Sequence, residues 1–121
     1  MRIDRTLFAR LAFVLFWPAL ALVAWGELTP HPPTIHASDK LLHFTAYFGL
    51  SGIATVALQR GRAVLAALLG LIALGGTLEV VQAFAGRDAE VLDEVANTLG
   101  AVLGALVGLG FLQLVALARG D

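Results

Sequence analysis

The chain contains no cysteine, and only 14% of its 121 residues are charged. Without cysteine it can form no disulfide, no thiolate metal site and no cysteine nucleophile. Basic residues do not gather with aromatic residues into a patch, so nucleic acid is not an expected partner. What the chain has in excess is apolar sequence, since 59% of its residues are hydrophobic and the mean hydropathy is +0.85. This composition lies far outside the range of soluble globular domains and predicts a membrane protein.

Four apolar segments are long enough to cross a bilayer, at about residues 7–25, 41–58, 63–83 and 94–118. Within the first, the apolar run Leu11 to Trp25 follows three arginines, and because further apolar segments come after it, we interpret it as an uncleaved anchor and not as a signal peptide. Pro18 lies in its middle, where it removes one backbone hydrogen bond and favours a kink. We expect an all-α integral membrane bundle of four transmembrane helices, which forms a single domain over residues 1–121.

The connections between these segments differ in character. Gly26 to Ser38 contains three prolines and predicts an extended loop, after which Ser38 or Asp39 caps the second helix. Gln59 to Arg62 is only four residues long and predicts a tight antiparallel hairpin of the second and third helices.

Basic residues are divided unevenly between the two sides of the predicted bundle. The side that carries the termini has six arginines, which are Arg2, Arg5, Arg10, Arg60, Arg62 and Arg119, whereas the other side has Lys40 and Arg87. By the positive-inside rule, both termini are therefore cytoplasmic. The segments around Asp39 and Asp93 then both face outward, so two groups of polar residues share one side.

Acids and amides within apolar sequence are costly unless they are paired or functional. Asp39, His43 and Tyr47 recur every four residues and so share one face of the second helix, with Lys40 beside His43. The residues that we expect to bind a ligand near the outer side are Asp39, Lys40, His43, Glu79, Gln82, Arg87, Asp93 and Asn97. Of these, His43 and Glu79 are the candidates for catalysis.

Glycines continue the polar face of the fourth helix. Gly100, Gly104 and Gly108 recur every four residues. Because glycine has no side chain, this spacing lets a second helix backbone come close, and it predicts helix packing without chemistry. Such packing would hold Asp93 and Asn97 against a neighbouring helix and away from lipid.

The same polar residues have simpler interpretations, which stay open. Glu79 could be an acid at the membrane interface. His43 could be a histidine that is merely hydrogen-bonded, and Asp93 with Glu94 could only cap a helix. A metal site could draw on one imidazole and three carboxylates, those of Asp39, His43, Glu79 and Asp93, but no HExxH or comparable spacing is present, so we expect no metal. Neither a GxSxG nor an SxxK pattern is present, so we expect no serine nucleophile. We also expect no cofactor.

The polar residues and glycines together form one pattern, which reads Asp39-Lys40-x-x-His43-Phe44-x-x-Tyr47, then Glu79-x-x-Gln82, Gly86-Arg87, Asp93 and Asn97-x-x-Gly100-x-x-x-Gly104. This pattern resembles that of the VanZ-like membrane proteins, and the resemblance covers about Asp39 to Gly108. It departs from the family at Ala85, where a proline is frequent, and at Glu90, where a small hydroxyl residue is common. The resemblance implies a small bundle of transmembrane helices, and the family's namesake is associated with low-level resistance to the glycopeptide antibiotic teicoplanin.

Three functional hypotheses follow. The first is a protein of the bacterial cytoplasmic membrane whose outer polar cluster binds a lipid headgroup, a cell-wall precursor or a lipophilic glycopeptide. The second is a membrane enzyme in which His43 acts as acid or base on a lipid-linked phosphate, while Lys40 and Arg87 stabilise charge. The third is a structural polar network that holds the helices together. Four spans leave no room for the inverted repeat of a transporter, although an oligomer stays open.

Overall fold

The fold is a bundle of four α-helices. The computed structural model describes residues 5–29, 36–84 and 91–120, and within these ranges it contains no strand. The helices are α1 (Arg5–Leu28), α2 (His36–Leu58), α3 (Gly61–Phe84) and α4 (Val91–Ala118). Each of them is long and apolar enough to cross a membrane, as judged by length and composition. The predicted all-α fold with four apolar helices is confirmed.

Two helix boundaries differ from the prediction in a way that matters for the site. α1 continues through Glu27 to Leu28, and α2 already begins at His36, so the predicted loop of residues 26–38 was too long. The prediction treated Gly26 as a helix end, but α1 continues through it, and the next residue, Glu27, is buried. Asp39 consequently lies within the first turn of α2 and does not precede the helix as a cap.

The turn between α2 and α3 is shorter than predicted, because only Gln59 and Arg60 lie between the two helices. Gln59 adopts a φ of 62°, a left-handed conformation that commonly ends a helix, and its backbone N–H donates to Thr55 O at 2.9 Å. Its side-chain Nε2 also donates to the backbone oxygen of Arg5 at 3.0 Å. The turn is thereby joined to the start of α1.

The most extensive helix contact is between α2 and α4. A Cβ added at Gly100 would collide with the backbone carbonyl of Phe44, and one added at Gly104 would collide with that of Phe48. Ser51 strengthens the contact, because its Oγ donates to the backbone oxygen of Ala101 at 2.6 Å. The glycines therefore allow two backbones to approach more closely than any side chain would permit.

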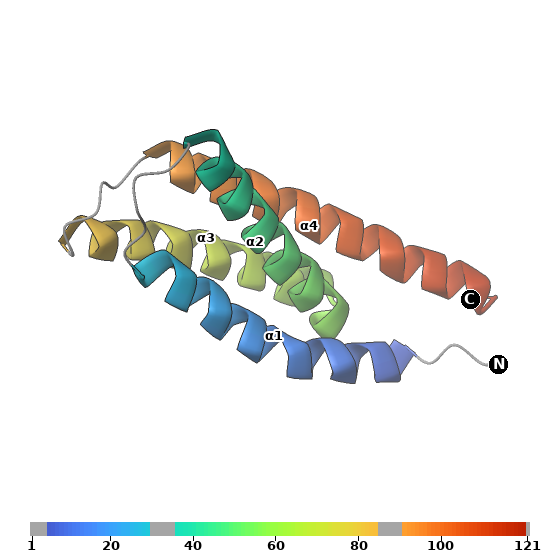
Figure 1. Ribbon diagram of the computed structural model, residues 1–121. Helices are drawn as coiled ribbons and strands as arrows, with labels where there is room; N and C mark the ends of the chain where they lie inside the picture. The colour runs from blue at the N-terminus through green and yellow to red at the C-terminus, as the bar shows by residue number, and fades with distance from the viewer. Residues whose placement is uncertain (1–4, 30–35, 85–90, 121) are drawn as a thin grey trace.

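Helices that follow one another in the chain run antiparallel, so α2 and α4 run parallel, and this fixes where the polar residues gather. The C-terminal ends of α1 and α3 and the N-terminal ends of α2 and α4 all lie at one end of the bundle (Figure 1). We call it the acidic end, because its described carboxylates are those of Glu27, Asp39, Glu79, Asp93 and Glu94. The opposite end holds the start of α1, the end of α4 and the turn from α2 to α3.

Candidate functional site

His43 lies at the centre of the acidic end, and its side chain is only 7% exposed. Its Nδ1 is 2.9 Å from Asn97 Oδ1 and 3.3 Å from Glu27 Oε1. Both neighbours are acceptors, so Nδ1 carries a hydrogen and donates it. One ring nitrogen of an α2 histidine thus contacts α1 and α4 together.

The amide of Asn97 is oriented by Glu94. Asn97 is fully buried, and its Nδ2 donates to Glu94 Oε2 at 3.2 Å, which turns its oxygen toward His43. α3 leaves room for this pair at Gly75, where an added Cβ would lie 2.6 Å from Glu94 Oε2 and 3.0 Å from Asn97 Nδ2. Gly75 is therefore a small residue in the wall of the polar cluster, and the sequence analysis did not single it out.

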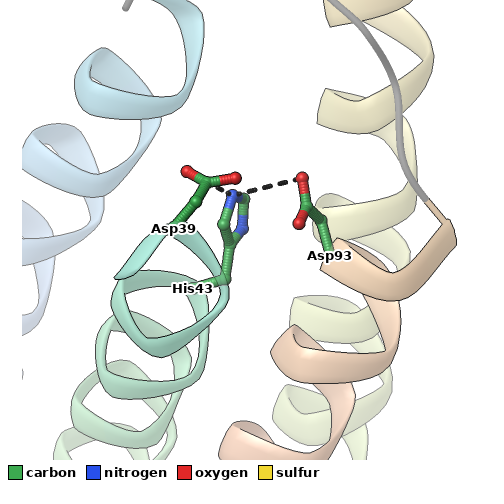
Figure 2. Close-up of side chains that lie close together, drawn as sticks. All are labelled: Asp39, His43 and Asp93. Carbon is green, nitrogen blue, oxygen red and sulfur yellow. Dashed lines mark ion pairs between the residues drawn. The ribbon is translucent and has the colours of Figure 1, made fainter. Parts of the chain in front are cut away.

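The other nitrogen of the ring, Nε2, points between two carboxylates. Asp39 Oδ1 lies 3.9 Å from it and Asp93 Oδ2 lies 3.7 Å from it, with Asp39 on α2 and Asp93 on α4 (Figure 2). Both distances exceed that of a hydrogen bond. The remaining oxygen of Asp93, Oδ1, is 3.1 Å from Lys40 Nζ. The spacing that placed Asp39, Lys40 and His43 together on α2 thus also brings them to Asp93.

Glu27 is a member of this cluster that the sequence analysis missed. It lies near the C-terminal end of α1 and is 8% exposed. Its Oε2 accepts a hydrogen bond from the Tyr47 hydroxyl at 3.3 Å, while Oε1 faces His43. The signal was an acid within one turn of Trp25 at the end of an apolar run, but the analysis assigned it to a loop.

A cavity of about 450 Å³ opens beside the cluster, between α1 and α2. Its apolar wall consists of Leu22, Val23, Trp25, Leu42 and Ala46, and Glu27, Asp39, His43 and Thr45 supply its polar groups. Sites that bind small amphiphilic molecules have this composition, namely an apolar enclosure with a few converging polar side chains.

The remaining predicted site residues have separate positions. Gln82 is buried on α3, and its Nε2 donates to the backbone oxygen of Glu27, one of the carbonyls that the end of α1 leaves without a helical partner. Glu79 is buried on the same helix, and among the described residues it is not within hydrogen-bond or ion-pair distance of His43. Arg87 lies outside the described residues.

The described residues of the acidic end carry strongly unequal charge. Five carboxylates are accompanied by one ammonium group, that of Lys40, and by the imidazole of His43. Lys40 itself is engaged by Asp93. The described part of the site is therefore better suited to hydrogen-bond donors or cations than to a bare anion.

Comparisons with known proteins found no match to this chain. No family model matches the chain, and neither a curated protein nor a solved structure matches it.

Proposed function

We propose that this protein is a VanZ-like protein of the bacterial cytoplasmic membrane, which binds the polar head of an amphiphilic molecule at its acidic end. The observation that carries the proposal is the cavity between α1 and α2, where an apolar wall meets Glu27, Asp39 and His43. The sequence pattern from Asp39 to Gly108 supports the family assignment.

The two sides of the cavity favour different parts of one ligand. Leu22, Leu42 and Trp25 are more than half exposed, and they offer a surface for an acyl or prenyl chain. Glu27 and Asp39 offer carboxylate oxygens, which accept hydrogen bonds from hydroxyl, amide or amino groups. A molecule with both a lipid chain and a sugar or peptide head would contact both sides at once.

Several molecules share this chemistry. A lipid with a hydroxyl-rich headgroup, a lipid-linked cell-wall precursor and an acylated glycopeptide such as teicoplanin all join a long apolar chain to a sugar or peptide head. An effect on antibiotic resistance follows only if the third of these is bound.

The proposed orientation places the acidic end outside the cytoplasmic membrane and both termini in the cytoplasm. Arg5, Arg10, Arg60, Arg62 and Arg119 all belong to the opposite end of the bundle. This asymmetry supports the orientation, because arginine is retained on the cytoplasmic side. The cavity would then be accessible to molecules of the outer leaflet.

A second candidate function is purely structural. The contacts of His43 join α1, α2 and α4, and those of Gln82 add α3. Polar contacts between membrane helices contribute about 0.6–2 kcal/mol each, so this network alone would account for the burial of its members. The two candidates differ in whether any molecule binds the cavity.

The test is a binding titration on the protein in lipid nanodiscs, with a substitution that fills the cavity. Thr45 is exposed and lines the cavity, so Thr45→Trp should block the ligand while leaving the buried cluster intact. Thr77→Trp is the matched control, because Thr77 is an exposed threonine of α3 whose hydroxyl donates to Ala73 O of its own helix.

The titration has three arms, which are a lipid-linked wall precursor, teicoplanin, and a glycopeptide without an acyl chain. We expect at least one of the first two to bind to the wild type and to Thr77→Trp, with affinity reduced tenfold or more in Thr45→Trp. The third should bind weakly everywhere. Equal affinities of all three proteins, or no binding in any arm, would contradict the proposal.

A further inference from the structure

The sequence spacing predicts no metal site, but the side-chain geometry indicates one. We propose that Asp39, His43 and Asp93 form a binding site for a divalent transition-metal cation such as Zn²⁺ or Mn²⁺. This inference does not depend on the amphiphile proposed above, because it rests on three side chains of α2 and α4 alone.

The three ligand atoms already converge. One oxygen of each carboxylate and one nitrogen of His43 lie within 4.8 Å of one another. Zinc with nitrogen and oxygen ligands at about 2.0–2.2 Å places neighbouring ligand atoms roughly 3.4 Å apart in a tetrahedron. The observed separations from His43 Nε2 are 3.7 Å to Asp93 and 3.9 Å to Asp39. Contraction of these two separations by a few tenths of an ångström, together with an approach of the two carboxylate oxygens, which lie within 4.8 Å of each other, would complete the geometry.

His43 supplies the observation that distinguishes this cluster from a group of surface acids. The side chain is 7% exposed, and Nε2 makes no hydrogen bond to any described residue, although it points directly between the two carboxylates (Figure 2). Because Nδ1 carries the hydrogen that it donates toward Asn97 and Glu27, the neutral ring directs the lone pair of Nε2 into that space.

The surroundings of these ligands resemble the outer shell of known metal sites. A metal-binding histidine almost always donates its other ring N–H to a carboxylate or carbonyl oxygen, as His43 does here. A ligating carboxylate is in turn hydrogen-bonded, and Lys40 engages Oδ1 of Asp93 while Oδ2 faces the ring. Lys40 and the cation would therefore occupy different oxygens of Asp93.

The donor set decides which cation is favoured. One imidazole and two carboxylates suit Zn²⁺ and Mn²⁺ better than Ca²⁺ or Mg²⁺, which prefer oxygen alone, or Cu(I), which prefers sulfur. The excess of carboxylates over the ammonium group of Lys40 in the described acidic end favours a divalent cation of either kind. Asp39 and His43 also line the cavity, so the cation would have one side open to incoming oxygen ligands.

The competing arrangement is an imidazolium ion, with protons on both nitrogens, held between Asp39 and Asp93. It uses the same contacts and requires no metal. The two arrangements are separated by direct titration of the metal.

The experiment measures the binding of Zn²⁺ alone, by calorimetry, to the purified full chain in phosphatidylcholine nanodiscs without a polyhistidine tag. All proteins carry His31→Gln and His36→Gln, so that His43 is the remaining imidazole of the chain. Mn²⁺ is then added in a parallel titration that is followed by electron paramagnetic resonance. We expect one site per chain for at least one of the two cations.

Variants assign that site to the proposed ligands. His43→Gln and Asp93→Asn should each weaken binding tenfold or more, and so should Asp39→Asn, whose side chain is 37% exposed and therefore tolerates replacement without unfolding. Glu79→Gln, which changes another buried carboxylate of the same end, should leave the affinity unchanged. Absence of binding to the parent protein, or binding that survives both Asp39→Asn and His43→Gln, would overturn the inference.

Discussion

Oε1 of Glu27 lies 3.3 Å from Nδ1 of His43, and this contact attaches α1 to the polar cluster that α2 and α4 build. α1 is otherwise held mainly by apolar side chains such as Phe16, Leu20 and Val23, which pack against the core around Tyr47. Glu27 therefore acts at the one end of α1 where the cavity lies. Its carboxylate is also one of the polar groups that the cavity offers to a ligand.

Two replacements of Glu27 should show how much its side-chain contacts and its negative charge each contribute to stability. Glu27→Ala should lower the free energy of unfolding by about 1–2 kcal/mol, because it removes the contacts to His43 and Tyr47. Glu27→Gln keeps an acceptor and adds a donor, so it should lie close to the wild type. Thermal unfolding in detergent, followed by circular dichroism, checks this order. Equal melting temperatures for Glu27→Ala and the wild type would show that the contact contributes nothing.

Close packing of α4 on α2 should make Gly104 intolerant of any side chain. Gly104→Ala should destabilise the protein by about 1–3 kcal/mol, because the added methyl group meets the carbonyl of Phe48. Gly110→Ala on the same helix is the control, since a Cβ there meets nothing within 4 Å. It should be neutral or slightly stabilising, because alanine favours a helix over glycine. Chemical denaturation of both variants tests the pair, and similar losses in both would rule out the contact as the cause.

Gly75 should affect the stability of the protein through its contact with Glu94. A methyl group at position 75 would come within 2.6 Å of Glu94 Oε2, and we expect Gly75→Ala to displace that carboxylate and to cost about 1 kcal/mol. Gly76→Ala meets the same side chain only at 3.9 Å and should cost less.

A double-mutant cycle isolates this coupling. In a Glu94→Ala background the displaced carboxylate is already gone, so Gly75→Ala should lose most of its effect on the free energy of unfolding. Strict additivity of the two substitutions would mean that Gly75 acts through some other neighbour.

Orientation is testable because the chain has no cysteine of its own. Phe84 and Arg62 are exposed residues near opposite ends of α3. In intact bacterial cells, Phe84→Cys should react with a membrane-impermeant thiol reagent, whereas Arg62→Cys should react only after lysis. The reverse pattern would place the acidic end in the cytoplasm and exclude ligands of the outer leaflet.

Sequence alone predicted the parts of this molecule that depend on periodicity and composition. Apolar runs predicted four helices, and spacings of four residues predicted the shared face of Asp39 and His43. What periodicity cannot give is the partner across a helix contact. The approach of Asn97 to His43 depends on how far the backbones of α2 and α4 come together, and that distance is decided by both helices at once.

The wrong assignment of Glu27 has a physical cause. Glu27 was assigned to a loop because Gly26 and the prolines that follow were treated as one interruption, yet glycine is tolerated within a membrane helix that packs on its neighbours. The role of Gln82 in ligand binding stays a prediction, and the structure adds that its Nε2 donates to a backbone carbonyl at the end of α1. When another segment of the chain supplies the hydrogen-bond donor for a helix end, the sequence around that helix end does not reveal it.

Thermal shift on four proteins tests most directly whether the acidic end is a binding site. Wild type, His43→Gln, Asp93→Asn and Glu79→Gln would be melted with and without a lipid-linked wall precursor or teicoplanin, in nanodiscs. A ligand that binds the folded state raises the melting temperature with concentration. We predict such a rise for the wild type, and a smaller rise or none for folded His43→Gln and Asp93→Asn. If no ligand raises the melting temperature of the wild type and the variants merely melt earlier, the cluster is a structural network and the proposed function is wrong.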